Sequence, residues 1–443
     1  MKFNKVGAVS LGCSKNAVDT EIMLGELKAY GFEIASDAKE AEIIIVNTCG
    51  FITSAKQDSI DAILEMAQYK LSGACKMLIV TGCLSQRYPE ELRAELPEVD
   101  MFWGVKDYPL FAARLAAICG HDGSCSALNS ACPQGSNETK RLLTTPSHRA
   151  YLRIADGCDN RCTYCAIPLI RGGRVSVPME KLLDEAASLA KNGVTELTVI
   201  AQDTSAYGID LYGRPMLKEL LLKLATIDEL KWIRLLYTYP NTVTEDLIDA
   251  MRDNPKICNY IDMPIQHISS AMLGAMNRHG SAEHIKHITD YIRDSAPDFI
   301  LRTTVMLGFP GETDADFDEL MLFMREHPFD RVGAFVYSAE DGTKASEMDD
   351  QVDTAVAESR LDALMRMQRS ISLELNKKRI GTVTEALVER VENGTAYCRS
   401  YAEAADVDGL IKVKLIGTAP AVGDYINIRI TAADYYDLIG ETL

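Results

Sequence analysis

The sequence predicts an α/β protein in three parts: a parallel α/β sheet, then a partial (β/α)6 barrel, and last a small all-β barrel. Two observations predict the first two parts. Short apolar runs rich in β-branched residues alternate with helical patterns over residues 1–118, and again over residues 149–376. The third part follows from a change to short alternating strands after Gly381. A chain of 443 residues is also too long for one ordinary core.

In the first part, residues 1–118, three expected strands each lead into a cysteine. The strands cover residues 6–12, 43–48 and 77–82, and the cysteines are Cys13, Cys49 and Cys83. Parallel strands place their carboxyl ends at one edge of a sheet, which is where Rossmann-like folds bind ligands. Three thiols are therefore expected to converge there, although free cysteines are often merely buried.

The middle part, residues 149–376, repeats a strand followed by a helix. Six βα units in series predict a barrel or partial barrel with its active site at the carboxyl ends of the strands. Residues 119–148, rich in Ser, Asn, Gly and Thr, are expected to form a linker before it. The expected strands cover residues 151–155, 196–200, 232–236, 260–263, 300–306 and 331–337.

The last part, residues 377–443, follows a long helical pattern over residues 353–379. Expected strands at 383–391, 410–415 and 425–431 alternate apolar and polar residues, with a Gly-Asp turn at 423–424. This pattern is typical of a small closed β-barrel.

Composition restricts the class of protein. The formal net charge is −18, so the chain has no global basic footprint of the kind that nucleic-acid binders use. No apolar run approaches the roughly 18 residues of a membrane span, and no signal peptide is visible. We therefore expect a cytoplasmic protein without a membrane partner, whose 12 cysteines are metal ligands or spectators rather than disulfides.

The strongest motif is CxxxCxxC, formed by Cys158, Cys162 and Cys165 just after the first strand of the middle part. Three thiolates can hold three irons of a 4Fe–4S cluster and leave the fourth iron open for a substrate. A structural zinc site would need a fourth ligand, and none is adjacent.

At this motif the chain resembles the radical S-adenosylmethionine (SAM) superfamily. The resemblance implies that SAM chelates the open iron and is cleaved by one electron to a 5′-deoxyadenosyl radical. It also implies that segments after the second and fifth barrel strands line the SAM pocket, with Gln202, Asp203, Gly308, Gly311 and Glu312 as candidate contacts. The second segment can also be interpreted as a plain turn into a helix that Thr313 and Asp316 cap, and the two interpretations are compatible.

The segments around Cys13, Cys49 and Cys83, residues 10–16, 47–51 and 81–83, resemble the amino-terminal domain of methylthiotransferases. The resemblance implies that these cysteines hold a second 4Fe–4S cluster with an open iron, and that the last part is a TRAM-like barrel. Cys119, Cys125 and Cys132 are spaced unlike common metal ligands. Packing is the expected role of the remaining cysteines, which are Cys75, Cys258 and Cys398.

Members of this family attach a methylthio group to a tRNA adenosine or to an aspartate of small-subunit ribosomal protein S12. Residues 12–16, 141–146 and 337–343 resemble the ribosomal-protein branch; the tRNA enzymes typically have Gln-Met-Asn where this chain has Ser-Lys-Asn. Residues 380–443 contain ten Asp or Glu and five Lys or Arg, a net charge of 5 − 10 = −5. An acidic barrel should repel tRNA and attract a basic ribosomal protein, unless these charges only solvate the surface.

The resemblance thus implies methylthiolation of the aspartate β-carbon, with SAM as both methyl donor and radical source. A low-potential electron donor such as flavodoxin or ferredoxin is an expected partner. The alternatives are a tRNA-adenosine methylthiotransferase with the same clusters, and a non-catalytic iron–sulfur protein that binds ribosomes or transfers electrons.

Overall fold

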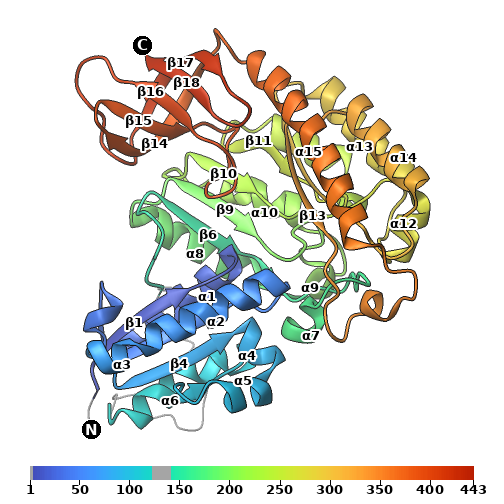
Figure 1. Cartoon of the computed structure of the whole chain (residues 1–443). Helices are drawn as coiled ribbons and strands as arrows, with labels where there is room; N and C mark the ends of the chain where they lie inside the picture. The colour runs from blue at the N-terminus through green and yellow to red at the C-terminus, as the bar shows by residue number, and fades with distance from the viewer. Residues whose placement is uncertain (1–2, 122–140) are drawn as a thin grey trace.

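A computed structural model describes residues 3–121 and 141–443 of the chain. Figure 1 shows three bodies in a row, with the amino-terminal sheet at one end, the carboxyl-terminal barrel at the other and a larger sheet between them. The predicted α/β class and three-part organisation are confirmed. The exact domain limits, 118/119, 148/149 and 376/377, remain predictions.

The amino-terminal sheet is parallel and has helices on both faces. Its strand order is β2-β1-β3-β4-β5, and every pairing is parallel. One face packs against α1 (Ser14–Ala29) and α6 (Phe111–Ile118), the other against α2 (Thr53–Ala67) and α5 (Pro89–Glu95). Because both faces are covered, the central strands are entirely buried. The strands are β1 (Lys5–Ser10), β2 (Glu33–Ile34), β3 (Ile43–Thr48), β4 (Met77–Gly82) and β5 (Met101–Phe102).

The middle sheet of the described chain has six parallel strands whose spatial order follows the sequence, β6-β9-β10-β11-β12-β13. The edges β6 and β13 do not pair, so this is the expected partial barrel. Helix α15 (Thr354–Lys377) packs against β13. The strands are β6 (Arg149–Arg153), β9 (Glu196–Ile200), β10 (Trp232–Leu235), β11 (Ile257–Asp262), β12 (Ile300–Leu307) and β13 (Arg331–Val336). The main covering helices are α8 (Met179–Lys191), α10 (Leu217–Leu224), α11 (Glu245–Arg252), α13 (Ala282–Ser295) and α14 (Asp314–Glu326).

The carboxyl-terminal part is a closed barrel in the order β14-β15-β16-β18-β17. Three strands match the expected ones: β14 (Val383–Glu392), β16 (Ile411–Lys414) and β17 (Tyr425–Ala433). The sequence patterns missed β15 (Thr395–Arg399) and β18 (Leu438–Thr442). Both are short, and β18 contains Gly440, where a Cβ would lie 2.9 Å from the carbonyl oxygen of Arg429. Glycine is rare in strands except at such close approaches.

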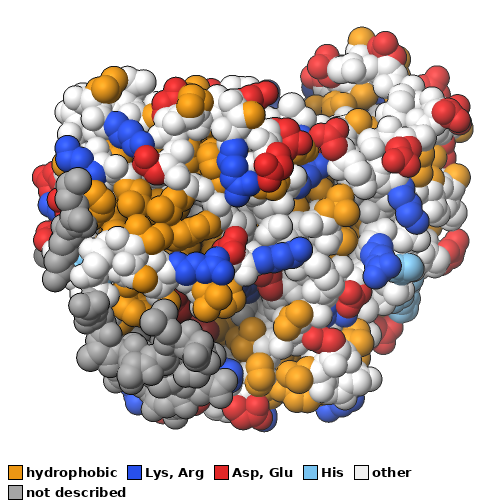
Figure 2. Space-filling view, turned by 90° about the horizontal axis from the view of Figure 1, so that it is seen from below, with side chains coloured by type: hydrophobic (Ala, Val, Ile, Leu, Met, Phe, Trp, Pro, Cys, Tyr) orange, Lys and Arg blue, Asp and Glu red, His pale blue; other side chains and the backbone are white. Residues whose placement is uncertain are grey.

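The surface carries charges of both signs. On the face seen in Figure 2, Lys and Arg side chains are interspersed with Asp and Glu side chains and do not gather into one basic patch. Within the described ranges, no helix combines the length and apolar character required to cross a membrane.

Candidate functional site

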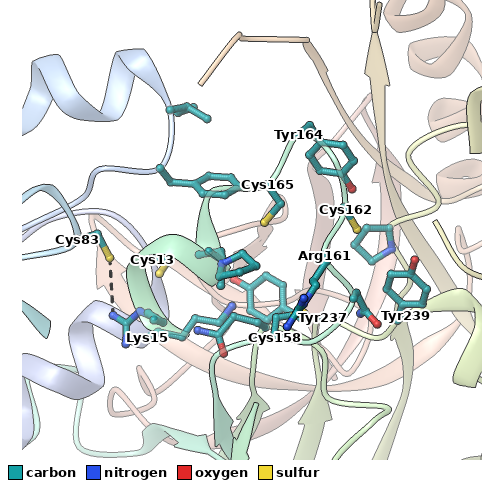
Figure 3. A pocket seen from close by; sticks show the side chains of 18 of the residues that line it. Cys13, Lys15, Cys83, Cys158, Arg161, Cys162, Tyr164, Cys165, Tyr237 and Tyr239 are labelled. Atoms are coloured by element: carbon teal, nitrogen blue, oxygen red, sulfur yellow. Dashed lines mark hydrogen bonds between the residues drawn. The ribbon is translucent and has the colours of Figure 1, made fainter. Parts of the chain in front are cut away.

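A cavity of about 420 Å³ lies between the carboxyl-terminal edges of the first two sheets. It receives residues that follow β1, β3 and β4 on one side and β6, β9, β10 and β11 on the other. Figure 3 shows the cavity from close by. Its lining includes both predicted sets of three cysteines: Cys13, Cys49, Cys83, Cys158, Cys162 and Cys165.

The first set comes from three adjacent strand ends. Cys13 caps the amino terminus of α1, Cys49 follows β3, and Cys83 begins α4 (Cys83–Arg87) directly after β4. Gly12 has φ +87°, and a Cβ at this position would lie only 2.7 Å from the Cβ of Cys49. Glycine therefore permits the close approach of the Cys13 and Cys49 loops. The predicted convergence of these three strand ends is present in the structure.

The second set lies on a loop that a small hairpin holds, β7 (Ala155–Asp156) with β8 (Val175–Ser176). The Cys158 amide donates to the carbonyl of Gly172 at 3.1 Å, and the Thr163 amide donates to Met276 at 3.0 Å. The loop is therefore fixed at both its start and its middle, while the three thiols remain partly accessible.

The cavity is electropositive although the chain is acidic. Among the described residues that line it there are four Lys or Arg side chains and no Asp or Glu: Lys15, Arg161, Arg171 and Arg278. Arg171 is neutralised by Asp19 at 2.7 Å and Asp156 at 2.9 Å. The other three cations form no ion pair with any described carboxylate. The cavity thus favours anionic groups.

The thiols are chemically suited to a metal rather than to free thiolate chemistry. Burial raises the pKa of Cys83 to about 12, of Cys165 to about 12 and of Cys158 to about 11. Without additional positive charge these groups are neutral thiols at neutral pH, and cysteine ligates metals as the thiolate. A bound metal supplies that charge, and the surrounding cations help to balance an anionic thiolate cluster.

The geometry does not suit a single ion. Within the described ranges, no three Cys, His, Asp or Glu side chains converge closely enough to hold one metal ion. A four-iron cluster spreads its ligands over a wider space than one ion does, because each thiolate binds a different iron. Two sets of three thiols around one cavity therefore fit multi-iron clusters better than zinc.

Gln202 is the candidate SAM contact that lines this cavity. Its Nε2 donates to Asp156 at 2.9 Å, whereas its buried Oε1 has no partner among the described residues. Gln266 lines the same cavity, and its Oε1 is also buried and unpartnered. Buried polar atoms normally find partners, so these two amides are available to a ligand.

The other candidate contacts lie outside the lining of the cavity. Asp203 accepts from Asn160 at 2.8 Å and from Ser205 at 2.8 Å, which places it behind the cysteine loop. Glu312 accepts from the Gly308 amide and pairs with Arg360 at 2.9 Å, so its carboxylate is already occupied. The cofactor roles of Asp203, Gly308, Gly311 and Glu312 remain predictions.

The alternative interpretation of this segment as a capped turn holds. Thr313 and Asp316 form a reciprocal capping box at the start of α14. This cap does not depend on any ligand.

Sequence reasoning did not identify the partners in the polar contacts that join the two sheets. Arg171, at the end of α7 (Ile167–Arg171), reaches across to Asp19 and Asn16 of α1 and lies 3.8 Å from the sulfur of Cys83. Asp19 also pairs with Arg153 of β6. A lone acid in a helix gives no signal of such partners, because they come from more than 130 residues away.

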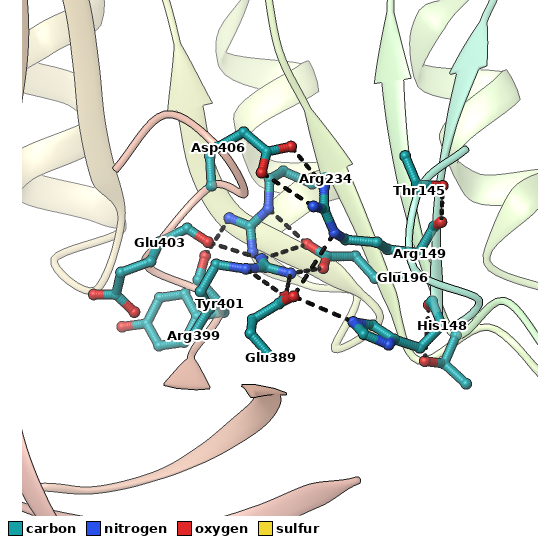
Figure 4. A network of polar contacts seen from close by, with 12 residues as sticks. Thr145, His148, Arg149, Glu196, Arg234, Glu389, Arg399, Tyr401, Glu403 and Asp406 are labelled. Atoms are coloured by element: carbon teal, nitrogen blue, oxygen red, sulfur yellow. Dashed lines mark hydrogen bonds and ion pairs between the residues drawn. The ribbon is translucent and has the colours of Figure 1, made fainter. Parts of the chain in front are cut away.

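Residues 399–408 of the last barrel cover the end of the middle sheet at which its strands begin. Arg399 binds Glu196 of β9 at 3.1 Å, and Arg234 of β10 donates to the Tyr401 carbonyl at 2.6 Å (Figure 4). Tyr260 of β11 donates to Asp408 at 2.7 Å. This end of the barrel is thus closed, and the cavity lies at the other end of the strands.

This interface changes the meaning of the acidic charge predicted for the last barrel. Four of its ten acidic residues are paired with arginines in or beside the interface: Glu389, Glu403, Asp406 and Asp408. All of these except Asp406 are also largely buried, so they do not act as outward charge. The charge argument for a basic partner is correspondingly weaker than the sequence suggested.

We expect this interface to weaken in acid. Burial alone would raise the pKa of Glu196, but Arg399 and Arg234 hold it at about 2. Burial alone would also raise the pKa of Glu389 and of Glu403. Hydrogen bonds and charges from His148 and Arg399 hold the pKa of Glu389 at about 2, and Arg379 holds that of Glu403 at about 2. Because these values lie below the ordinary 4.5, the stabilisation is complete above pH 4.5 and is lost as the pH falls from there through 2.

The fluorescence of Trp232 can be used to follow the weakening of this interface. Its indole packs edge-on against the ring of Tyr425 of the last barrel, with the ring centroids 4.9 Å apart. In a Trp103→Phe variant, its fluorescence should shift within that acid range. Emission that stays constant throughout the range would contradict the assignment.

Three family models match the chain. They are described as "Uncharacterized protein family UPF0004" over residues 5–104, "Radical SAM superfamily" over residues 152–324 and "TRAM domain" over residues 380–443. Among solved structures, the radical SAM methyltransferase TsrM from Kitasatospora setae has a TM-score of 0.57 at 12% identity, covering 90% of this chain and 81% of TsrM. That similarity concerns the fold alone. The fold and the cysteine loop define a radical SAM enzyme, and this class implies a 4Fe–4S cluster and SAM.

Curated relatives narrow the class. The ribosomal protein uS12 methylthiotransferase RimO of Clostridioides difficile is 46% identical over 440 residues, covering 99% of both chains. The protein of the same name from Geobacter sulfurreducens is 46% identical over 442 residues, covering 99% of this chain and 98% of its own. The chain belongs to the RimO family of radical SAM methylthiotransferases. The expectation of an enzyme rather than a non-catalytic iron–sulfur protein is thereby confirmed.

Proposed function

We propose that this enzyme adds a methylthio group to the β-carbon of an aspartate in ribosomal protein uS12. SAM would serve both as methyl donor and as radical source. The observation that carries the proposal is the meeting of two cysteine triplets, from two different sheets, around one cavity. A reaction that joins a sulfur group to a carbon radical needs both components in one enclosed space.

Each triplet has its own role in the proposal. Cys158, Cys162 and Cys165 would hold the 4Fe–4S cluster that binds SAM. The three cysteines of the amino-terminal sheet, Cys13, Cys49 and Cys83, would hold a second 4Fe–4S cluster. When bound, the two clusters supply the electron for cleaving SAM and an iron site for the sulfur to be transferred.

The remaining lining residues would bind and shield the reactants. The free amide oxygens of Gln202 and Gln266 can accept hydrogen bonds from amino groups of SAM. Arg278 has no carboxylate partner among the described residues; it donates to the Tyr164 hydroxyl at 3.0 Å, so it can balance negative charge beside the second cysteine set. Phe51 and Ile52 add apolar wall, which keeps bulk water from the reacting carbon.

The partners follow from this chemistry. The relatives' substrate uS12 is a ribosomal protein, so the enzyme would act in the cytoplasm. A low-potential donor such as flavodoxin or ferredoxin would supply electrons. A tRNA substrate is not expected, because the chain carries a net charge of −18 and tRNA binding relies on clustered cations.

The proposal can be tested anaerobically. The clusters are reconstituted, and dithionite, SAM and sulfide are added together with either purified uS12 or tRNA. We expect mass spectrometry to find one methylthio group on an aspartate of uS12 and none on tRNA. Modified adenosine in tRNA would assign the enzyme to the tRNA reaction instead. Modification of neither substrate, with 5′-deoxyadenosine formed, would refute both assignments.

A further inference from the structure

Lys15 is a buried cation that the fold leaves without a counter-ion. It lies in the first turn of α1 and is only 7% exposed, yet it lines the cavity. Its ammonium makes no hydrogen bond or ion pair with any of the described residues. The ammonium lies over the ring of Tyr237, whose centroid is 3.1 Å from Nζ. Figure 3 shows both side chains together with Cys13 and Cys158.

Burying the Lys15 ammonium costs free energy unless a counter-ion or hydrogen-bond acceptor compensates its charge. Lysine is almost never buried without a partner, because its charge loses hydration. A cation–π contact offsets part of the loss, and no Asp or Glu of the described chain lines the cavity to offset the rest. An anionic thiolate cluster in the cavity would balance part of this charge without giving the ammonium a hydrogen-bond acceptor oxygen. A ligand that enters the cavity can supply that acceptor, and a carboxylate is the group that an ammonium binds best.

The position of the ammonium is fixed from both sheets. Lys15 follows Cys13 by two residues, whereas Tyr237 follows β10 of the partial barrel. Tyr237 has φ +60°, a conformation that its ring and backbone hold only because the surroundings require it, and its amide donates to Asp262 at 3.0 Å. A carboxylate bound to Lys15 would thus lie within the cavity that both cysteine sets share.

We propose that Lys15 binds the side-chain carboxylate of the substrate aspartate. This inference rests on the proposed function and deepens it, because it makes Lys15 a positioning residue that selects an acidic side chain. The bond would hold the adjacent β-carbon in the cavity. A neutral asparagine or an adenine base at the same place would leave the ammonium uncompensated, so the enzyme would discriminate against both.

The test compares purified uS12 with a form in which the target aspartate is replaced by asparagine. Binding to the reconstituted holoenzyme is measured by fluorescence anisotropy. The wild type should bind the aspartate form about tenfold more tightly, as expected for one charge-assisted hydrogen bond. Lys15→Met keeps the length of the side chain and should abolish this preference, and Lys15→Arg should restore part of it. Lys28→Met, at the exposed end of the same helix, is the matched control and should keep the full preference.

Three outcomes would overturn the inference. An undiminished preference in Lys15→Met would show that another group reads the carboxylate. If Lys15→Met instead loses affinity for SAM in equilibrium dialysis while it keeps the uS12 preference, the bound carboxylate is that of SAM. If the wild type binds neither form of uS12, the proposed function itself fails, which the other two outcomes leave intact.

Discussion

Cys158→Ala is expected to abolish 5′-deoxyadenosine formation, whereas Cys13→Ala is expected to keep it and to lose only methylthio transfer. The reason is the division of the cysteines between two sheets. Cys158 belongs to the loop after β6 and Cys13 to the edge of the amino-terminal sheet. Loss of one ligand in either triplet removes one cluster and leaves the other triplet complete.

The measurements are iron content and product analysis on anaerobically reconstituted protein. Each variant should bind about half the iron of the wild type, because each retains one intact ligand set. Cys75→Ala is the matched control, since Cys75 is buried in the core between β4 and its helices and does not line the cavity. It should keep full iron and activity. Loss of all iron in either single variant, or loss of 5′-deoxyadenosine in Cys13→Ala, would contradict two independent clusters.

Most of the architecture could be predicted because it depends on local pattern. The buried runs 43–48 and 77–82 are apolar strands, and parallel topology then brings Cys13, Cys49 and Cys83 to one edge without further information. The second set, Cys158, Cys162 and Cys165, could be predicted from the CxxxCxxC spacing, which is also a local pattern. All six cysteines line the cavity.

The parts that could not be predicted depend on contacts between distant segments. Lys15 reads as an ordinary surface residue of a helix until the Tyr237 ring is placed over it. Gln266 carried no motif, and its unpartnered amide becomes visible only within the cavity. The acidic residues of the last barrel looked like surface charge, but Glu403 is 1% exposed and pairs with Arg379.

Glu196→Gln should cost about 3–5 kcal/mol of stability at the junction between the middle sheet and the last barrel. Glu196 is fully buried and binds two arginines, Arg234 at 3.0 Å and Arg399 at 3.1 Å. Removing its charge leaves the Arg234 guanidinium, also fully buried, without a carboxylate among the described residues. An uncompensated buried charge is the main source of the cost.

Urea unfolding followed by Trp232 fluorescence in the Trp103→Phe background measures the loss, because Trp232 touches Tyr425 across this junction. Glu385→Gln is the matched control: Glu385 pairs with Lys231 across the same junction at 2.6 Å, but both side chains are about 40% exposed. A pair so exposed should contribute less than about 1 kcal/mol. Equal losses in the two variants would mean that carbonyls such as that of Tyr401 satisfy the buried arginines, and that apolar contacts hold the barrel in place.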